Sequence, residues 1–356
     1  MLAQPRLENS YWTDAINSGI YNAALRYGDR VEQLKSDDDL RRASGAYVLT
    51  VGYYTDWLES RLTALDLVRA NPVIVNACML PLQRCQYSGV VFELEKIISD
   101  CVSGLYGAGA HRIAFLGANP SSVTDRVKCS AFPSQRDVIF AGRHIDECVD
   151  RFIDSLGMTG YDAALCANDT VVVCLYSHLT RRGIHIPDDF LIIGMGNSYI
   201  GSRLRTPLTS ISFDYREMGE QAVRLVHFLR RNAGGCHVTF SLPCRLIVRS
   251  SAGNIREPGV STSESRSSIG KEDSGYFGGS EIDNIIRVEA ILQSADEIDR
   301  EIIFALAAGS TSEQIAEQMW LSERAVRYRV SNLLRRCGIK SRAELICALR
   351  RASGVE

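Results

Sequence analysis

Apolar residues alternate between helical and strand spacing along most of residues 1–252. Residues 12–27 place Ile16, Ile20 and Tyr27 on one face of a helix, and the apolar run 47–52 that follows is typical of a buried strand. The same alternation predicts helices over 57–70, 92–109, 147–157, 171–183 and 218–231, and strands over 72–77, 111–117, 161–169, 190–197, 209–213 and 244–250. Strands that alternate with helices indicate an α/β fold with parallel sheets and helices on both faces.

The alternation stops after residue 252. Residues 253–281 contain six Gly, seven Ser and only five large apolar residues, too few to offset the entropy of ordering the chain. We therefore expect a flexible linker over 253–282, which separates a large domain over 1–252 from a small one over 283–356.

The small domain shows four short helical patterns with one shared core. Ser312 and Ser322 are expected N-caps of the second and third helices, and Gly309 and Gly338 end the helices before them. The apolar stripes are Ile302, Ala305 and Leu306; Ile315, Ala316 and Met319; Val326, Val330, Leu333 and Leu334; and Leu345, Ile346 and Leu349.

Charge is nearly balanced over the whole chain but not locally. The 40 Lys and Arg residues against 42 Asp and Glu give a formal net charge of −2, which argues against wholesale coating of nucleic acid. Between residues 321 and 342, however, seven cations face one anion, Glu323. This concentrated basic stretch includes the third predicted helix of the small domain.

Composition and motifs limit the other function classes. The eleven Cys residues form no paired CxxC spacing, so we expect reduced cytosolic thiols and no metal. No apolar run approaches the ~20 residues that span a bilayer, and the first residues lack the features of a signal peptide, so we expect a cytoplasmic protein with no membrane partner. Without a GxSxG, HExxH or P-loop pattern, we expect no enzyme, no catalytic residue and no cofactor.

Several stretches of the large region carry a family likeness. YDAALCAND, HLTRRGIHIPDDFLIIGMGNS, RTPLTSISFDYREMGEQAVRLVHFLRR and LPCRLIVRSSA resemble, in order and spacing, the effector-binding domain of LacI/GalR-type repressors, and HRIAFLG and NSYWTDAINSGIYNAALRYG match its first half more loosely. The resemblance covers about residues 9–252. It implies a periplasmic-binding-protein-like fold of two lobes, with three chain crossings between them and a sugar-sized ligand in the cleft.

Three features depart from that family. Only residues 1–8 precede NSYW, where the family has an apolar strand, so we expect the first strand to be missing or displaced. The chain is shorter than the family between Arg126 and Arg151, so we expect a trimmed C-terminal lobe. GMGN at 194–197 stands where the family has GFDD, whose first Asp binds effector hydroxyls, so Gly196 removes a principal carboxylate.

The same resemblance implies a set of ligand-binding positions. Arg126 approximates an arginine that bridges ligand hydroxyls, Asn168 matches part of an ND pair at a strand end, and Asn197 matches the second Asp of GFDD. The full set is Tyr11, Trp12, Arg126, Asn168, Asp169 and Asn197.

Four of these positions also have a purely structural alternative. Tyr11 and Trp12 match an aromatic pair whose faces stack on a sugar ring, but they also fit a core staple. Arg126 fits a surface cation, and Asp169 fits a helix N-cap, which is compatible with ligand contact. Asn168 is the residue that we favour as functional.

EQIAEQMWLSERAVRYRVSNLLRRCGIKSRAEL in the small region closely resembles the LuxR-type helix-turn-helix domain. A helix of this length fits a DNA major groove, and its Arg side chains can reach guanine or phosphate oxygens. By family position Arg327 faces bases with Tyr328 beside it, while Arg324, Arg335, Arg336 and Lys340 contact phosphate. The DNA-binding candidates are Ser322, Arg324, Arg327, Tyr328, Arg329, Arg335, Arg336 and Lys340; the alternative is a solvated charged helix face.

Two residues of this helix differ from the LuxR-type pattern. Ala325 replaces the usual Thr and removes a phosphate contact, whereas Arg329 replaces the usual His and adds charge. We expect DNA affinity to be kept while the sequence preference changes.

Together these features predict a transcriptional regulator that binds double-stranded DNA as a homodimer and responds to a small, sugar-like effector. Two alternatives stay open: a regulator whose large domain is a ligand-free dimerisation or interaction module, and a sugar-binding protein without a regulatory role. The missing signal-peptide pattern and the basic helix argue against the second alternative.

Overall fold

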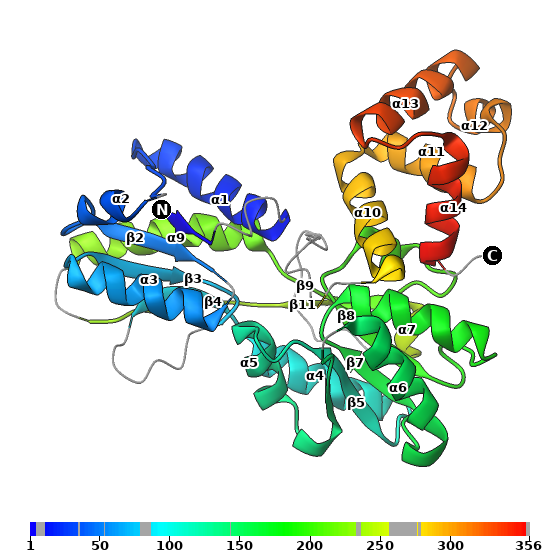
Figure 1. Ribbon diagram of the computed structural model, residues 1–356, viewed down its shortest axis with the longest axis horizontal. Coiled ribbons are helices and arrows are strands. Elements are labelled where there is room, and N and C mark those ends of the chain that lie inside the picture. Colours follow the sequence, from blue (N-terminus) through cyan, green and yellow to red (C-terminus); the bar gives the residue numbers. More distant parts are fainter. Residues whose placement is uncertain are drawn as a thin grey trace.

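The computed structural model describes residues 1–353 except 5–10, 35, 53, 79–86, 143, 233–235, 256–275 and 277–278. For Tyr11, Asp37 and Ser353 it describes the backbone alone. The described chain forms two α/β lobes and a helical C-terminal unit (Figure 1).

The N-terminal lobe is a five-stranded parallel sheet in the order β1-β2-β3-β4-β10. Its strands are β1 (Leu2–Ala3), β2 (Tyr47–Val51), β3 (Asn71–Val75), β4 (Ser88–Phe92) and β10 (Thr239–Leu242), and its helices are α1 (Tyr11–Tyr27), α2 (Asp37–Arg41), α3 (Thr55–Leu67) and α9 (Tyr215–Arg231). Helices α1 and α9 can pack closely because Gly219 has no side chain. A Cβ atom there would lie only 2.1 Å from the carbonyl oxygen of Ile16.

The C-terminal lobe is a six-stranded sheet in the order β11-β9-β8-β7-β5-β6. All neighbours are parallel except β11 and β9, which are antiparallel. Its strands are β5 (Ile113–Ala118), β6 (Val138–Phe140), β7 (Ala163–Cys166), β8 (Leu191–Met195), β9 (Thr209–Ser212) and β11 (Arg245–Ile247), and its helices are α4 (Leu94–Gly107), α5 (Val123–Ala131), α6 (Ile145–Thr159), α7 (Asp169–Arg181) and α8 (Tyr199–Ser202).

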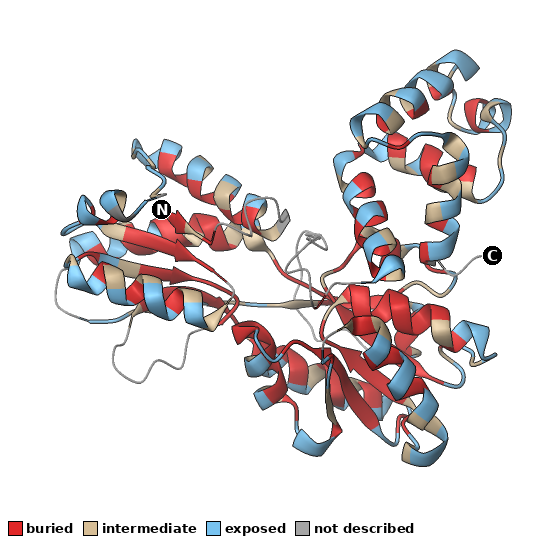
Figure 2. Ribbon diagram, viewed as in Figure 1, coloured by how far each residue is buried: buried red, intermediate tan, exposed pale blue. Residues whose placement is uncertain are grey.

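The chain crosses between the two lobes three times, as the resemblance implies. The crossings run from β4 to α4, from β9 to α9 and from β10 to β11. Aromatic rings gather beside the first two crossings: the rings of Phe92 and Phe213 are 5.2 Å apart, and Tyr215 lies 5.5 Å from Phe92. Figure 2 shows the strands of both sheets as mostly buried.

One predicted departure from the family is wrong. We expected the first strand to be missing or displaced, but Leu2 and Ala3 pair in parallel with Thr50 and Val51 of β2. The strand is present with two residues, which is too short to give an apolar run in the sequence.

The C-terminal unit contains five helices: α10 (Ser280–Ser294), α11 (Glu297–Ala307), α12 (Ser312–Gln318), α13 (Glu323–Arg336) and α14 (Arg342–Ser353). The last four correspond to the four predicted patterns. Helix α12 is capped by Thr311, whose side chain accepts from the N–H of Gln314, and not by Ser312. The predicted boundary between linker and small domain, at residues 282 and 283, falls inside α10.

Helix α10 and helix α14 pack on the C-terminal lobe, against α7 and α8 (Figure 1). Ile282, Ile285 and Leu292 of α10 share one buried cluster with the α7 side chains and with Leu345 and Leu349 of α14. A separate core within the small unit consists of Ile302, Leu306, Ile315, Ala316, Val326 and Val330. The C-terminal lobe and the helical unit are thus joined through a continuous apolar interface.

Candidate ligand site and nucleic-acid interface

Asn168 lies at the carboxyl end of β7, where it caps helix α7. Its Oδ1 accepts from the backbone N–H of Val171 at 3.1 Å, and its Nδ2 donates to the hydroxyl of Tyr276 at 3.0 Å. Its φ and ψ are those of extended chain, as an N-cap requires. The N-cap role that we considered for Asp169 therefore belongs to Asn168, while the amide N–H group of Asn168 points to a second partner.

Asp169 and Asn197 lie in a buried network inside the C-terminal lobe. Asp169 is 1% exposed and accepts from the N–H of Ser198 at 2.7 Å and from the hydroxyl of Ser210 at 2.8 Å. Burial raises the pKa of Asp169, against these hydrogen bonds and the charge of Arg249. Asn197 has a φ of 49° and accepts from Arg249 at 2.7 Å. Asp169 thus connects the ends of β7 and β8 to β9, and Asn197 connects the end of β8 to the segment after β11.

Arg126 joins the two lobes. It is exposed on α5 of the C-terminal lobe, and its guanidinium donates to the hydroxyl of Thr55 at the start of α3 in the N-terminal lobe. Nearby, Tyr54 and Ser122 form an isolated antiparallel bridge between the same two segments. A cation at this point of contact is placed to respond to any change in the spacing of the lobes.

Trp12 is half-buried near the start of α1 and belongs to the aromatic group beside the crossings. Its ring lies 6.1 Å from that of Tyr215 in a tilted arrangement, and it packs against the main core of the protein. The structure therefore gives Trp12 the staple contact that we considered and leaves part of its surface accessible. The side chain of Tyr11 lies outside the described part of the chain.

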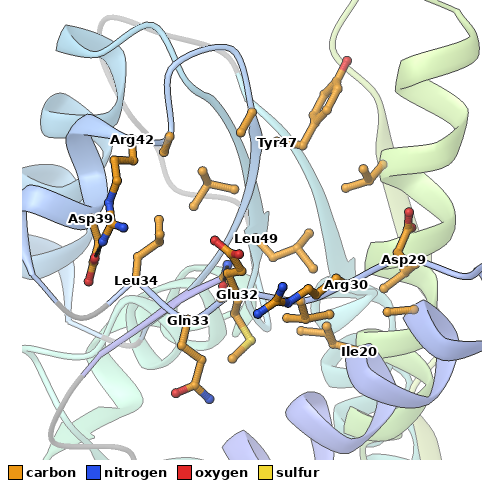
Figure 3. Close-up of a pocket in the computed structure, with 18 of the residues that line it drawn as sticks. Ile20, Asp29, Arg30, Glu32, Gln33, Leu34, Asp39, Arg42, Tyr47 and Leu49 are labelled. Carbon is orange, nitrogen blue, oxygen red and sulfur yellow. Dashed lines mark hydrogen bonds and ion pairs between the residues drawn. The ribbon is translucent and has the colours of Figure 1, made fainter.

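A cavity of about 670 Å³ lies on the N-terminal lobe at the start of β2 (Figure 3). Its apolar floor includes Ile20 and Leu49, and its charged rim includes Asp39 and Arg42, which pair with each other. None of the six predicted ligand residues lines it. Ligands of parallel α/β sheets bind at the carboxyl ends of strands. This cavity lies at the opposite end, beside the start of β2, so it is not the expected ligand site.

Helix α13 exposes a polar face with cations at its centre. Ser322 caps the helix by accepting from the N–H of Ala325 at 3.1 Å, as predicted. The side chain of Arg327 is 70% exposed and pairs with Glu323, Tyr328 is 69% exposed, and Arg324 is exposed as well. The buried residues Val326, Val330 and Leu333 lie on the opposite side of the helix.

Other predicted DNA contacts have partners inside the small unit. The guanidinium of Arg329 lies 2.8 Å from Asp296 and 2.7 Å from Asp299; these hydrogen bonds raise its pKa and lower that of Asp296. Arg336 donates to the carbonyl of Ser294 at 2.7 Å. The charge that Arg329 adds is therefore balanced internally, and its contact with DNA stays a prediction.

Two more of the predicted phosphate contacts remain at the surface. Arg335 is exposed and donates to the side chain of Asn332 at 2.9 Å. Lys340 is exposed beyond the end of α13, and its backbone N–H donates to Glu344. With Arg324 and Arg327 they form what we call the basic face: Arg324, Arg327, Arg335 and Lys340.

Sequence analysis did not identify two buried polar residues near the contact between the C-terminal lobe and α10. Tyr276 is buried and bonds to Asn168, and Glu289 of α10 is fully buried between the lobe and the helical unit. Glu289 lies on an otherwise apolar stripe formed by Ile282, Ile285 and Ile286. A carboxylate within such a stripe was the available signal for a buried acid.

Within the described residues, no group of three or more His, Cys, Asp or Glu side chains has the arrangement of a metal site. In the same part of the chain, no helix is both long and apolar enough to cross a bilayer.

Comparison with known families supports the division of the chain. Residues 102–252 match the family described as periplasmic binding protein-like domain, and residues 298–349 match the bacterial regulatory proteins of the luxR family. The chain thus joins a periplasmic binding protein-like domain to a C-terminal LuxR-type helix-turn-helix domain, and both predicted resemblances are confirmed.

Curated relatives of the large domain are repressors. The HTH-type transcriptional repressor PurR of Mannheimia succiniciproducens is 24% identical over an alignment 196 residues long, which covers 49% of this chain and 58% of that repressor. The sucrose operon repressor of Escherichia coli is 31% identical over 96 residues, 27% of this chain and 28% of the repressor. The chain therefore matches less than two thirds of the length of either relative.

Solved structures confirm the predicted fold class. The transcriptional regulator CelR in complex with cellobiose has a TM-score of 0.56 and 19% identity, covering 70% of this chain and 83% of that one. A LacI family regulator from Arthrobacter sp. FB24 in complex with lactose has a TM-score of 0.53 and 23% identity, covering 70% and 97%. These similarities show a two-lobed α/β fold.

Proposed function

We propose that this protein is a transcriptional regulator that binds double-stranded DNA through α13 and is controlled by a small polyhydroxylated effector. The observation that carries the proposal is the basic face, whose four side chains are exposed on a LuxR-type domain. The same chain contains a periplasmic binding protein-like domain. Cations on an exposed helix of this kind supply phosphate contacts and base contacts.

The proposed effector site lies at the carboxyl ends of β5 and β7. There the amide N–H of Asn168 and the backbone carbonyl of Gly117 form a donor and acceptor pair, both bonded to the hydroxyl of Tyr276. Such a pair suits a hydroxyl group. Trp12 supplies an aromatic surface and Arg126 a cation at the contact between the lobes. Cellobiose and lactose, bound by two structural neighbours, belong to the same chemical class.

Asp169 and Asn197 take a supporting part in this proposal. Their side chains are bound to Ser210 and Arg249 inside the lobe, so a ligand would have to break those hydrogen bonds to reach them. They hold the strand ends that carry Asn168 in place. The absence of the family carboxylate at Gly196 leaves Asn168 as the principal polar anchor.

We further propose a cytoplasmic homodimer without enzymatic activity. A single helix-turn-helix unit contacts one half-site, and two copies related by a two-fold axis contact two half-sites and bind more tightly. The related repressors are regulators and not enzymes by name.

A thermal-shift screen with Asn168→Asp tests the effector site. Asp keeps the acceptor oxygen that caps α7 but lacks the amide N–H donor, so it should retain the helix cap and lose ligand affinity. We expect cellobiose, lactose, ribose or a related polyol or nucleoside to raise the melting temperature of the parent chain, and the shift to disappear in the Asp variant.

Asn168→Ala is the matched comparison, because it loses the cap as well and should destabilise the free protein by about 1 kcal/mol. An equal shift in the parent and the Asp variant would place the ligand elsewhere. No shift with any compound would favour the alternative of a ligand-free dimerisation module.

A further inference from the structure

Tyr276 occupies the polar anchor at the strand ends. Its side chain is 6% exposed. Its hydroxyl accepts from Nδ2 of Asn168 at 3.0 Å and donates to the carbonyl of Gly117 in β5. A phenol hydroxyl thus fills the donor and acceptor pair to which the effector hydroxyl was assigned above.

Tyr276 lies four residues before the first residue of α10, and further polar contacts hold that helix on the lobe. Glu281 in its first turn accepts from Ser177 at 2.9 Å and from Arg181 at 3.1 Å, both on α7. Glu289 in its second half accepts from the backbone N–H groups of Tyr199 and Ile200, at 2.7 and 2.8 Å. Helix α10 is therefore fixed just before its start, in its first turn and in its second half.

The same helix carries the DNA-binding unit. Asn284 donates to the carbonyl of Ala348 at 3.0 Å, and Arg287 lies 3.0 Å from Glu344, so α14 is attached to α10 by polar contacts as well as by the shared core. A loosening of α10 from the lobe would change the position of α14 and, with it, that of α13.

We propose that Tyr276 is a built-in occupant of the effector site, and that a sugar-like ligand displaces its hydroxyl from Asn168 and Gly117 and so loosens α10 and the DNA-binding unit from the C-terminal lobe. The proposal rests on the proposed function, since it takes the strand ends as the effector site. Exchange is chemically balanced, because one hydroxyl group with a donor and an acceptor replaces another. Ligand binding and the attachment of α10 then oppose each other.

Hydrogen exchange on the full chain tests the attachment without any ligand. Tyr276→Phe keeps the buried ring and removes the hydroxyl, and we expect the backbone amides of residues 280–294 to exchange about five-fold faster. Tyr106→Phe changes an exposed tyrosine on α4 and serves as the control. Unchanged exchange of α10 in Tyr276→Phe would overturn the proposal.

Calorimetric titration of the same proteins with cellobiose, lactose and ribose tests the displacement. A sugar that competes with the hydroxyl should bind Tyr276→Phe about five-fold more tightly than the parent chain and should speed exchange of α10 in the parent. Equal affinity for the two proteins would refute the displacement and leave the proposed function intact. Absence of binding to both would count against the effector function itself and reduce Tyr276 to a structural anchor.

Discussion

Replacing Arg324 and Arg335 together by Ala is expected to weaken binding of duplex DNA about 100-fold at 0.1 M salt. Both side chains are exposed on α13. Without its cation, each phosphate keeps about one counterion that binding would otherwise release, which lowers the affinity by roughly a factor of ten at that salt concentration. The slope of log affinity against log salt should fall by about two. Fluorescence anisotropy at two or more salt concentrations measures both quantities.

Arg231→Ala is the matched control, because Arg231 is an exposed arginine at the end of α9 in the N-terminal lobe. It removes one positive charge without touching the basic face. Arg327→Ala should differ from both by relaxing the preference at one base pair, by roughly 1–3 kcal/mol. Wild-type affinity and salt slope in the double variant would remove α13 from the DNA interface.

Glu289→Gln is expected to remove the contribution of Glu289 to the loss of stability that the parent chain shows between pH 4.5 and 7. Burial raises the pKa of Glu289 from 4.5 to about 7, against hydrogen bonds from Ile200, Tyr199 and Gln293. Because the pKa of Glu289 is raised in the folded state, its protonated form contributes to stability. This contribution to the free energy of unfolding is complete below pH 4.5 and is lost as pH rises through 7. Over this pH range the free energy of unfolding should fall by about 3 kcal/mol.

Denaturant unfolding at pH 5 and pH 8 measures this effect as the difference between variant and parent. The comparison is needed because His178, whose pKa is raised chiefly by its bond to Glu281, changes stability in the same direction, while Glu281, with a pKa of about 2, titrates below the window. Glu95→Gln, on the exposed face of α4, is the control. Parallel pH profiles for Glu289→Gln and the parent would show that Glu289 is ionised when buried.

The α/β architecture could be predicted because parallel strands are buried on both faces and read as continuous apolar runs. Strand β4 (Ser88–Phe92) escaped prediction because its short apolar run lies directly before α4, and its last residue, Phe92, was assigned to that helix. Strand β10 escaped because its residues alternate between exposed and half-buried positions at a sheet edge. Local periodicity identifies long buried elements, but it does not locate the boundary between two elements that follow each other directly.

The candidate site was predicted by position but not by orientation. Asn and Asp are equally good N-caps, so nothing in the pair Asn168 and Asp169 tells which side chain caps α7 and which turns into the lobe. The attachment of α10 was hidden for a different reason. The surrounding Gly and Ser residues indicate a linker, and whether the apolar stripe of α10 is buried depends on the α7 surface far away in the sequence.

Selection of bound sequences from random duplex DNA by the full chain tests the central claim most directly. A dimeric regulator with two copies of α13 should enrich a two-fold symmetric sequence whose half-sites are spaced by about one helical turn or a multiple of it. The Arg324 and Arg335 double variant should fail to enrich it. No enrichment of any sequence by the parent chain, at a salt concentration where it remains folded, would contradict the assignment of this protein as a DNA-binding regulator.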